Sequence, residues 1–253
     1  MQYQEVRIIK NTAIAPHIYS IWLEAKDIAK KIKAGQFLML TINNHNHPFL
    51  ARPFSIADTQ PNSINIIYKV VGFGTELLSR KAKNEKISIF GPLGKSLKLP
   101  KNKVINLCAG GMGIAPLHFL AKKLSVNNQL TLYYGVKTAS ELIFQKEFKS
   151  LGIKTFITTE DGSFGRKGLI TELLFNDLDP QTQYLYVAGP MTLVKKVAAM
   201  KLPSSNLQKI GFLEEHMGCG CGICFCCGVK GKNNHYLRVC QDGPAFDLSK
   251  IEL

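Results

Sequence analysis

Residues 103–124 read KVINLCAGGMGIAPLHFLAKKL, and this stretch decides the fold class. An apolar run of strand length ends in a turn at Gly110, Gly111 and Gly113, and a helix-like pattern begins directly after it. Pro116 stands where the third glycine of a G-x-G-x-x-G turn would be, and proline fits the first turn of a helix. Glycine-rich turns between a strand and a helix hold dinucleotide pyrophosphates in open α/β folds, so we expect a dinucleotide here.

Strand-like and helix-like segments alternate from this turn to residue 201. The strand-like segments are QLTLYYG (129–135), KTFITTE (154–160) and QYLYVAGP (183–190), and the helix-like ones are SELIFQKEFKSLG (140–152), GLITELLF (168–175) and MTLVKKVAAMK (191–201). The alternation predicts a parallel sheet, and we assign residues 101–204 to an α/β domain. Gly189, Pro190 and Met191 end a later strand at the carboxyl edge where such folds bind ligands. Glu160 ends another strand there, where its carboxylate either holds ribose hydroxyls or belongs to a solvated loop.

The first hundred residues carry short apolar runs rich in Ile, Val, Phe and Tyr, separated by turn residues. These runs predict an antiparallel β-barrel domain over residues 1–100, with one helix near residues 74–82. The strand segment Arg52-Pro53-Phe54-Ser55 offers a guanidinium to a diphosphate and a hydroxyl to a flat heterocycle. Gly74 and Thr75 open the helix and offer amides and a hydroxyl to a second phosphate. The structural alternatives are a surface arginine and an ordinary helix cap.

Six of the seven cysteines fall between residues 219 and 240. Four follow the C-x4-C-x2-C…C spacing of plant-type 2Fe-2S proteins, which makes them the predicted metal ligands: Cys219, Cys224, Cys227 and Cys240. We therefore predict a small C-terminal cluster module over residues 205–253. Cys221 and Cys226 leave open a zinc site, although two separate C-x2-C knuckles are absent. Cys108 ends an apolar strand and is expected in the core.

The chain has 253 residues and a formal net charge of +14. The excess lysines are scattered upstream of residue 203, while basic and acidic side chains balance between Pro203 and Leu253. This distribution indicates a solvated face or a surface for a dinucleotide or acidic partner, and we expect no nucleic-acid partner. No uncharged apolar run approaches the roughly 18–20 residues of a membrane span, and the N-terminus lacks a signal-peptide pattern. We expect a cytoplasmic protein in which the thiols stay reduced.

The order of these motifs resembles the ferredoxin-reductase superfamily of flavin and nicotinamide enzymes. The motifs are RPFS (52–55), GFGT (72–75), GGMGIAP (110–116) and AGPM (188–191). With the four cysteines and QDGPAF (241–246), the whole chain resembles the electron-transfer subunits of dihydroorotate dehydrogenase B. The resemblance implies FAD, NAD and a 2Fe-2S cluster as cofactors. It implies that FAD is bound by Arg52, Pro53, Phe54, Ser55, Ile67, Tyr68, Lys69, Gly74 and Thr75.

The same resemblance implies a function. Electrons from an FMN-containing catalytic subunit that oxidises dihydroorotate would cross the cluster and FAD to NAD, as a step of pyrimidine (UMP) synthesis. The implied assembly is a heterotetramer with two copies of each subunit. Nicotinamide exchanges hydride and the cluster exchanges single electrons, so a flavin, which does both, is needed between them. Hydride transfer requires no acid–base side chain, and no catalytic residue is expected in this chain.

Two alternatives remain open at the level of sequence. Similar relays serve sulfide dehydrogenases, NADH–ferredoxin oxidoreductases and hydrogenases, although Cys219 favours the dihydroorotate reading because some of those relatives carry aspartate there. A zinc-stabilised nucleotide-binding regulator also fits the basic charge and the cysteines. The resemblance implies NAD rather than NADP, and the absence of an arginine pair after residues 129–135, where Lys137 is the only nearby cation, agrees with this.

Overall fold

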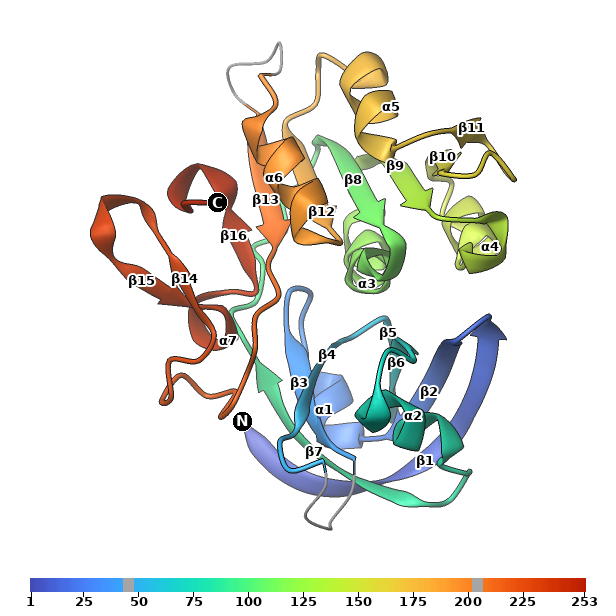
Figure 1. The fold of residues 1–253 in the computed structure, drawn as a ribbon, viewed down its shortest axis with the longest axis vertical. Helices are drawn as coiled ribbons and strands as arrows, with labels where there is room; N and C mark the ends of the chain where they lie inside the picture. Colours follow the sequence, from blue (N-terminus) through green and yellow to red (C-terminus); the bar gives the residue numbers. More distant parts are fainter. Residues whose placement is uncertain (43–47, 202–206) are drawn as a thin grey trace.

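The computed structural model describes residues 1–42, 48–201 and 207–253, which form three parts (Figure 1). The N-terminal part is a curved, barrel-like sheet, and the middle part is a second sheet with helices packed against it. The C-terminal part, coloured red, lies beside both sheets and holds six of the seven cysteines. The expected order of β-barrel, α/β domain and cysteine module is confirmed.

Seven strands form the N-terminal sheet in the order β4-β3-β7-β1-β2-β6-β5, and neighbouring strands are antiparallel. Their bounds are β1 Gln2–Ala15, β2 Ile18–Glu24, β3 Phe37–Thr41, β4 Arg52–Ser55, β5 Asp58–Gln60, β6 Ser63–Lys69 and β7 Lys86–Leu93. In β1, buried Val6 and Ile8 alternate with exposed neighbours, so one face of this strand is solvated. In β6, six consecutive residues from Ser63 to Tyr68 are buried, which means that both of its faces are covered.

Two helices accompany this sheet. Helix α2, Phe73–Arg80, confirms the helix expected near residues 74–82 and buries Leu78. Helix α1, Lys26–Lys31, is not predicted from the sequence. Only Ile28 of its six residues is buried, so no apolar periodicity marks it as a helix.

The second sheet has the strand order β11-β10-β9-β8-β12-β13-β16. The strands are β8 Val104–Gly110, β9 Gln129–Val136, β10 Lys154–Thr159, β11 Arg166–Lys167, β12 Tyr184–Ala188, β13 Gln208–Phe212 and β16 Ala245–Asp247. All neighbours pair in parallel except β13 and β16. The helices between them are α3 Ile114–Leu124, α4 Gln145–Ser150, α5 Ile170–Asp177 and α6 Met191–Ala199. The parallel α/β architecture is thus the predicted one.

One predicted helix is wrong in its extent. Residues 140–152 were expected to form a single helix, but a 3-10 turn at Ala139–Glu141 is followed by non-helical residues, and α4 begins only at Gln145. Phe144 has φ +64°, a left-handed conformation that interrupts a helix. Its ring stacks on His118 of α3 with 4.1 Å between centroids. Packing against α3 therefore outweighs the local helical pattern.

The C-terminal part is short and irregular. Its elements are β14 Gly228–Lys230, β15 Tyr236–Arg238 and the four-residue helix α7 Val239–Asp242. Strands β13 and β16 come from residues assigned to the cluster module, yet both extend the α/β sheet. The predicted boundary near residue 204 falls in 202–206, outside the described residues. No helix in the described parts of the chain is long and apolar enough to span a membrane.

Candidate cofactor sites

The three segments expected to bind FAD lie together in the barrel. The ring of Phe54 in β4 lies edge-on to that of Tyr68 in β6, with 6.1 Å between centroids. A Cβ built at Gly74, at the start of α2, would lie 3.5 Å from Nε of Arg52. Ile67, Tyr68 and Gly74 are buried, Pro53 is exposed, and the others, Arg52, Phe54, Ser55, Lys69 and Thr75, are half-buried. These nine residues therefore contribute to one region of the barrel.

The turn before α2 is held by Thr75. The Thr75 hydroxyl donates to the Gly72 carbonyl at 2.9 Å and accepts from the N–H groups of Val71 at 3.0 Å and Gly72 at 3.2 Å. The guanidinium of Arg52 donates to the carbonyl of Leu50. The Thr75 hydroxyl thus shapes the turn, and the Arg52 guanidinium supplies a positive charge close to it.

Tyr68 and Lys69 end β6 with different partners. The Tyr68 hydroxyl donates to Oδ1 of Asn11 at 3.0 Å, and burial raises the pKa of Tyr68, so it stays a neutral phenol. Nζ of Lys69 forms an ion pair of 2.7 Å with Glu141 of the α/β domain. The Lys69 side chain therefore links the two domains, a contact that no sequence motif indicates.

The residues expected to bind nicotinamide line one cavity of about 570 Å³. All six lie in its wall: Gly110, Gly111, Gly113, Gly189, Pro190 and Met191. Ile18 and Lys69 of the barrel also line it, so the cavity lies between the two domains. A dinucleotide bound at the glycine-rich turn can therefore reach the barrel.

Two of these positions require glycine because backbone segments approach each other closely there. A Cβ at Gly113 would lie 2.1 Å from the carbonyl oxygen of Ala188, a distance that no side chain permits. Gly189 has φ +144°, and a Cβ there would lie 2.8 Å from the carbonyl oxygen of Gly110. The two turns after β8 and β12 thus pack backbone against backbone.

Besides Lys69 and Glu141, four charged side chains line the same cavity. Lys137 is the cation noted in the sequence, and Lys196 of α6 adds a second. Glu160 lies in the wall as well, and its carboxylate is exposed. Glu214, just after β13, is open to the cavity, but partial desolvation by the surrounding walls raises the pKa of its carboxyl. No motif marks Lys196 or Glu214, because only the fold brings α6 and the end of β13 to this edge.

The four predicted cluster ligands fall into two pairs. The N–H of Cys219 donates to Sγ of Cys224, and the N–H of Cys224 to Sγ of Cys219, both at 3.4 Å. The N–H of Cys240 donates to Sγ of Cys227 at 3.4 Å, and both of these residues are 2% exposed. Each iron of a 2Fe-2S cluster needs two protein ligands, which two pairs of thiolates supply.

Backbone amides gather around one sulfur in particular. Sγ of Cys219 accepts from the N–H groups of Ile223 at 3.3 Å and of Cys221 and Cys224 at 3.4 Å. Desolvation opposes ionisation, but these hydrogen bonds outweigh it and lower the pKa of Cys219 to about 6. The N–H groups of Cys219 and Cys226 likewise lower the pKa of Cys224. The loop therefore favours the thiolate form at positions 219 and 224.

The remaining thiols behave differently. Desolvation raises the pKa of Cys221 and also that of the predicted ligand Cys240, the latter to about 12, and a hydrogen bond with the Cys224 side chain raises the pKa of Cys226. Cys108 is fully buried and its pKa rises to about 12, which confirms its expected place in the core. In the described part of the chain, no three His, Cys, Asp or Glu side chains gather closely enough to hold a single ion. The paired soft donors fit a two-iron cluster.

Family comparisons agree with this geometry. Residues 107–199 match the oxidoreductase NAD-binding domain, and residues 214–252 match the iron-sulfur cluster binding domain of dihydroorotate dehydrogenase B. The second match favours an iron–sulfur cluster over zinc. The fold and the sites define an electron-transfer oxidoreductase with a ferredoxin-reductase fold.

Curated relatives narrow this class. The chain is 34% identical to the dihydroorotate dehydrogenase B (NAD(+)) electron transfer subunit of Desulforamulus reducens, over 96% of this chain and 95% of the relative. The subunit of Caldanaerobacter subterraneus subsp. tengcongensis is 36% identical, over 98% of this chain and 97% of the relative. The chain belongs to the family of dihydroorotate dehydrogenase B electron transfer subunits.

Solved structures share the fold. An NADH-dependent reduced ferredoxin-NADP oxidoreductase superposes with a TM-score of 0.86 at 28% identity, covering 98% of this chain and 89% of the other. A ferredoxin NADP+ reductase from Neisseria gonorrhoeae with bound FAD and NADP gives 0.71 at 19% identity, covering 83% of this chain and 99% of the other. The second similarity concerns the fold alone.

Proposed function

We propose that this chain carries electrons between a dihydroorotate-oxidising catalytic subunit and NAD, through a 2Fe-2S cluster and FAD. The main support is that one chain combines two features. Its cysteine thiols lie in pairs and accept hydrogen bonds from backbone N–H groups, and a cavity at the glycine turns opens onto the barrel. The cofactors supply the redox chemistry, and the protein supplies binding, orientation and electrostatics.

The proposed FAD site uses the nine barrel residues from Arg52 to Thr75 described above. Arg52 would neutralise the diphosphate, and the start of α2 lies beside it, since a Cβ built at Gly74 would be 3.5 Å from Nε of Arg52. The proposed NAD site uses the two glycine turns. Glu160 in its wall disfavours an extra phosphate on the ribose, which supports NAD over NADP.

The proposed cluster ligands are Cys219, Cys224, Cys227 and Cys240. The amide hydrogen bonds support Cys219 and Cys224 over Cys221 and Cys226, because they stabilise negative charge on sulfur.

The proposed docking surface for the catalytic subunit is the outer side of the cluster loop. Ile223 and Phe225 lie between the ligand cysteines and are 80% and 57% exposed. Large apolar side chains in such positions are typical of protein interfaces. An FMN-containing partner, a heterotetramer with two copies of each subunit, and a cytoplasmic location complete the proposal.

Reconstitution tests this function. The chain is mixed with a dihydroorotate-oxidising catalytic subunit, and NADH formation from dihydroorotate and NAD is followed. We expect NADH formation only when both proteins are present. If the catalytic subunit alone reduced NAD equally fast, the proposed role would be wrong.

A relay to another partner is the second candidate, favoured by the similarity to the NADH-dependent reduced ferredoxin-NADP oxidoreductase. The same assay with ferredoxin as the electron partner separates the two. Efficient ferredoxin reduction without coupling to dihydroorotate oxidation would favour this alternative.

A further inference from the structure

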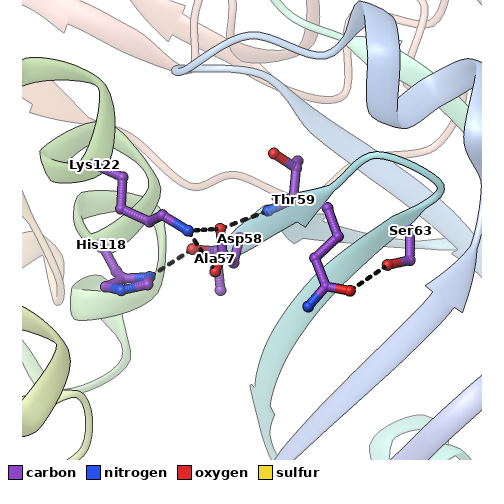
Figure 2. Close-up of polar contacts among 7 residues, drawn as sticks. Ala57, Asp58, Thr59, Ser63, His118 and Lys122 are labelled. Carbon is purple, nitrogen blue, oxygen red and sulfur yellow. Dashed lines mark hydrogen bonds and ion pairs between the residues drawn. The ribbon is translucent and has the colours of Figure 1, made fainter.

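A polar contact joins the two cofactor-binding domains at α3 (Figure 2). Nδ1 of His118 lies 2.8 Å from the carbonyl oxygen of Ala57, and Nζ of Lys122 lies 2.6 and 2.8 Å from the two carboxylate oxygens of Asp58. His118 and Lys122 are four residues apart on α3 and face the barrel together. We call these four residues the strut.

The barrel end of the strut is firmly held. The N–H of Ala57 donates to the Asn65 carbonyl at 2.9 Å, and the N–H of Thr59 donates to Oδ1 of Asp58 at 2.7 Å. Ala57 is fully buried. Both acceptors of the strut therefore have fixed positions relative to β6.

The α3 end is held as well. His118 is 3% exposed, and its ring lies between the stacked ring of Phe144 at 4.1 Å and the edge-on ring of Phe148 at 5.6 Å. A carbonyl oxygen only accepts hydrogen bonds, so Nδ1 carries the proton that it donates to Ala57. Aromatic packing thus fixes the direction of this hydrogen bond.

The strut connects the two sites by very short stretches of chain. Ala57 follows Ser55, the last residue of the proposed FAD strand, by two positions. His118 follows Gly113, in the nicotinamide turn, by five positions, which is roughly 7.5 Å along a helix axis. Because a helix is rigid over this length, movement of α3 relative to the barrel would move the nicotinamide turn relative to the FAD strand.

We propose that His118 and Lys122 are positioning residues that set how nicotinamide approaches the flavin. This inference rests on the proposed function. Neither residue lines the cavity, so neither is expected to touch the dinucleotide. The hydride transferred and the products formed stay the same, and only the relative placement of the two sites depends on the strut.

A second contact between the domains is less suitable for mutation than the strut. Lys69 and Glu141 also join the domains, but both line the dinucleotide cavity. Changing either would alter binding and positioning together. Lys122 and Asp58 can be changed without entering the cavity.

The experiment compares Lys122→Asp with Lys123→Asp in the holo-chain. Lys123 is the neighbouring exposed lysine of α3, and its amino group lies over the Phe119 ring of the same helix, 5.3 Å from the centroid. Flavin reduction by NADH is measured by stopped flow, and NAD+ affinity is measured by calorimetry. The absorbance of the charge-transfer complex between reduced flavin and NAD+ is recorded as a readout of ring stacking.

We expect Lys122→Asp to slow flavin reduction by about tenfold or more and to weaken the charge-transfer band. The dissociation constant of NAD+ should change by less than about twofold, because the cavity wall is intact. The combined variant Asp58→Lys with Lys122→Asp restores the ion pair, and we expect it to recover most of the rate. Lys122→Met removes the charge without creating repulsion, and we expect it to slow flavin reduction as well. This variant keeps the test valid if Lys122→Asp folds poorly.

Two results would overturn the inference. One is a reduction rate in the Lys122 variants equal to that of Lys123→Asp, and the other is a charge-swapped variant as slow as the single variant. A wild-type chain with bound flavin that NADH does not reduce would instead overturn the proposed function, and this inference with it.

Discussion

Cys219 and Cys221 are two residues apart in one loop, yet the backbone treats their sulfurs differently. Three N–H groups point at Sγ of Cys219, and the pKa of its thiol falls, whereas desolvation raises that of Cys221. A thiolate is the form that binds iron, so the loop is prepared for ligation at position 219.

This difference predicts unequal effects of two serine variants. We expect Cys219→Ser to lose most of the cluster, measured as iron and acid-labile sulfide per chain and by electron paramagnetic resonance. Cys221→Ser is the matched control and should keep about two irons per chain. Equal loss in both variants would contradict the ligand assignment.

Gly113 lies where the turns after β8 and β12 pack against each other. In Gly113→Ala the new Cβ would meet the Ala188 carbonyl at 2.1 Å, so the two turns must separate. We expect a loss of about 1–3 kcal/mol in the free energy of unfolding and weaker NADH binding, measured by denaturation and titration. Gly72→Ala is the control, because Gly72 has extended backbone and open space around its Cβ position. Unchanged NADH affinity in Gly113→Ala would count against the site.

Sequence motifs identify some of the site residues and not others. Cysteine spacing and glycine turns identify ligands that are close together in the chain, because their geometry is local. Lys196 and Glu214 carry no such pattern, since they reach the cavity only through the sheet order. The direction of the backbone N–H groups favours Cys219 over Cys221 as a cluster ligand. The spacing of cysteines in the sequence carries no information about that direction.

Among the elements, α3 links the sheet to the barrel, and its buried His118 has consequences for stability. Desolvation lowers the pKa of His118 in the folded protein, although the Ala57 carbonyl, Asp58 and Glu147 favour the proton and Lys122 opposes it. The unfolded chain titrates near the ordinary value of about 6.5.

The sign of the pH effect follows from this shift. As the pH falls below about 6.5, His118 is protonated in the unfolded state but remains neutral in the folded state. The free energy of unfolding therefore decreases as the pH falls from about 6.5 to the lower pKa of the folded state. His118→Asn keeps a donor for the Ala57 carbonyl but cannot titrate. We expect a smaller loss of stability between about pH 7.5 and pH 5.5 in this variant than in the wild type, measured by urea unfolding. An identical pH dependence would show that His118 does not contribute.

Periodicity predicted most elements correctly and failed where tertiary contacts decide. Strong patterns identified β8, α3 and β9, most of whose apolar residues lie in one core, while Cys108 and Tyr133 lie in a second. The residues before α4 have a helical pattern, but Phe144 adopts a left-handed conformation to stack on His118. Such a contact joins residues far apart in sequence, and a local window does not contain it.

At the scale of the whole molecule, the three-part order was predictable and the connections between parts were not. Strands β13 and β16 flank the cysteine loop and extend the α/β sheet, so the loop is anchored at both ends. A Cβ at Gly220 in this loop would lie 2.8 Å from Cγ of Met39, so the loop also packs on the barrel. Each part thus contacts both others.

The exposed side of this loop carries a prediction about assembly. We expect Ile223→Glu to weaken binding to the catalytic subunit by about tenfold or more, because a charge replaces an apolar side chain that is 80% exposed in the isolated chain. Reduction of the flavin by NADH should be unchanged. Association is measured by analytical ultracentrifugation, and Val126→Glu, at a 76% exposed position in the turn after α3, serves as the control. Equal affinity for the catalytic subunit in the two variants would place the docking surface elsewhere.

The most direct test of the relay is an anaerobic visible spectrum of the purified chain, with iron and sulfide analysis, before and after addition of NADH. We expect flavin bands with a broad cluster absorbance, about two irons per chain, and bleaching of both features by NADH. A colourless, zinc-containing protein that NADH leaves unchanged would contradict it.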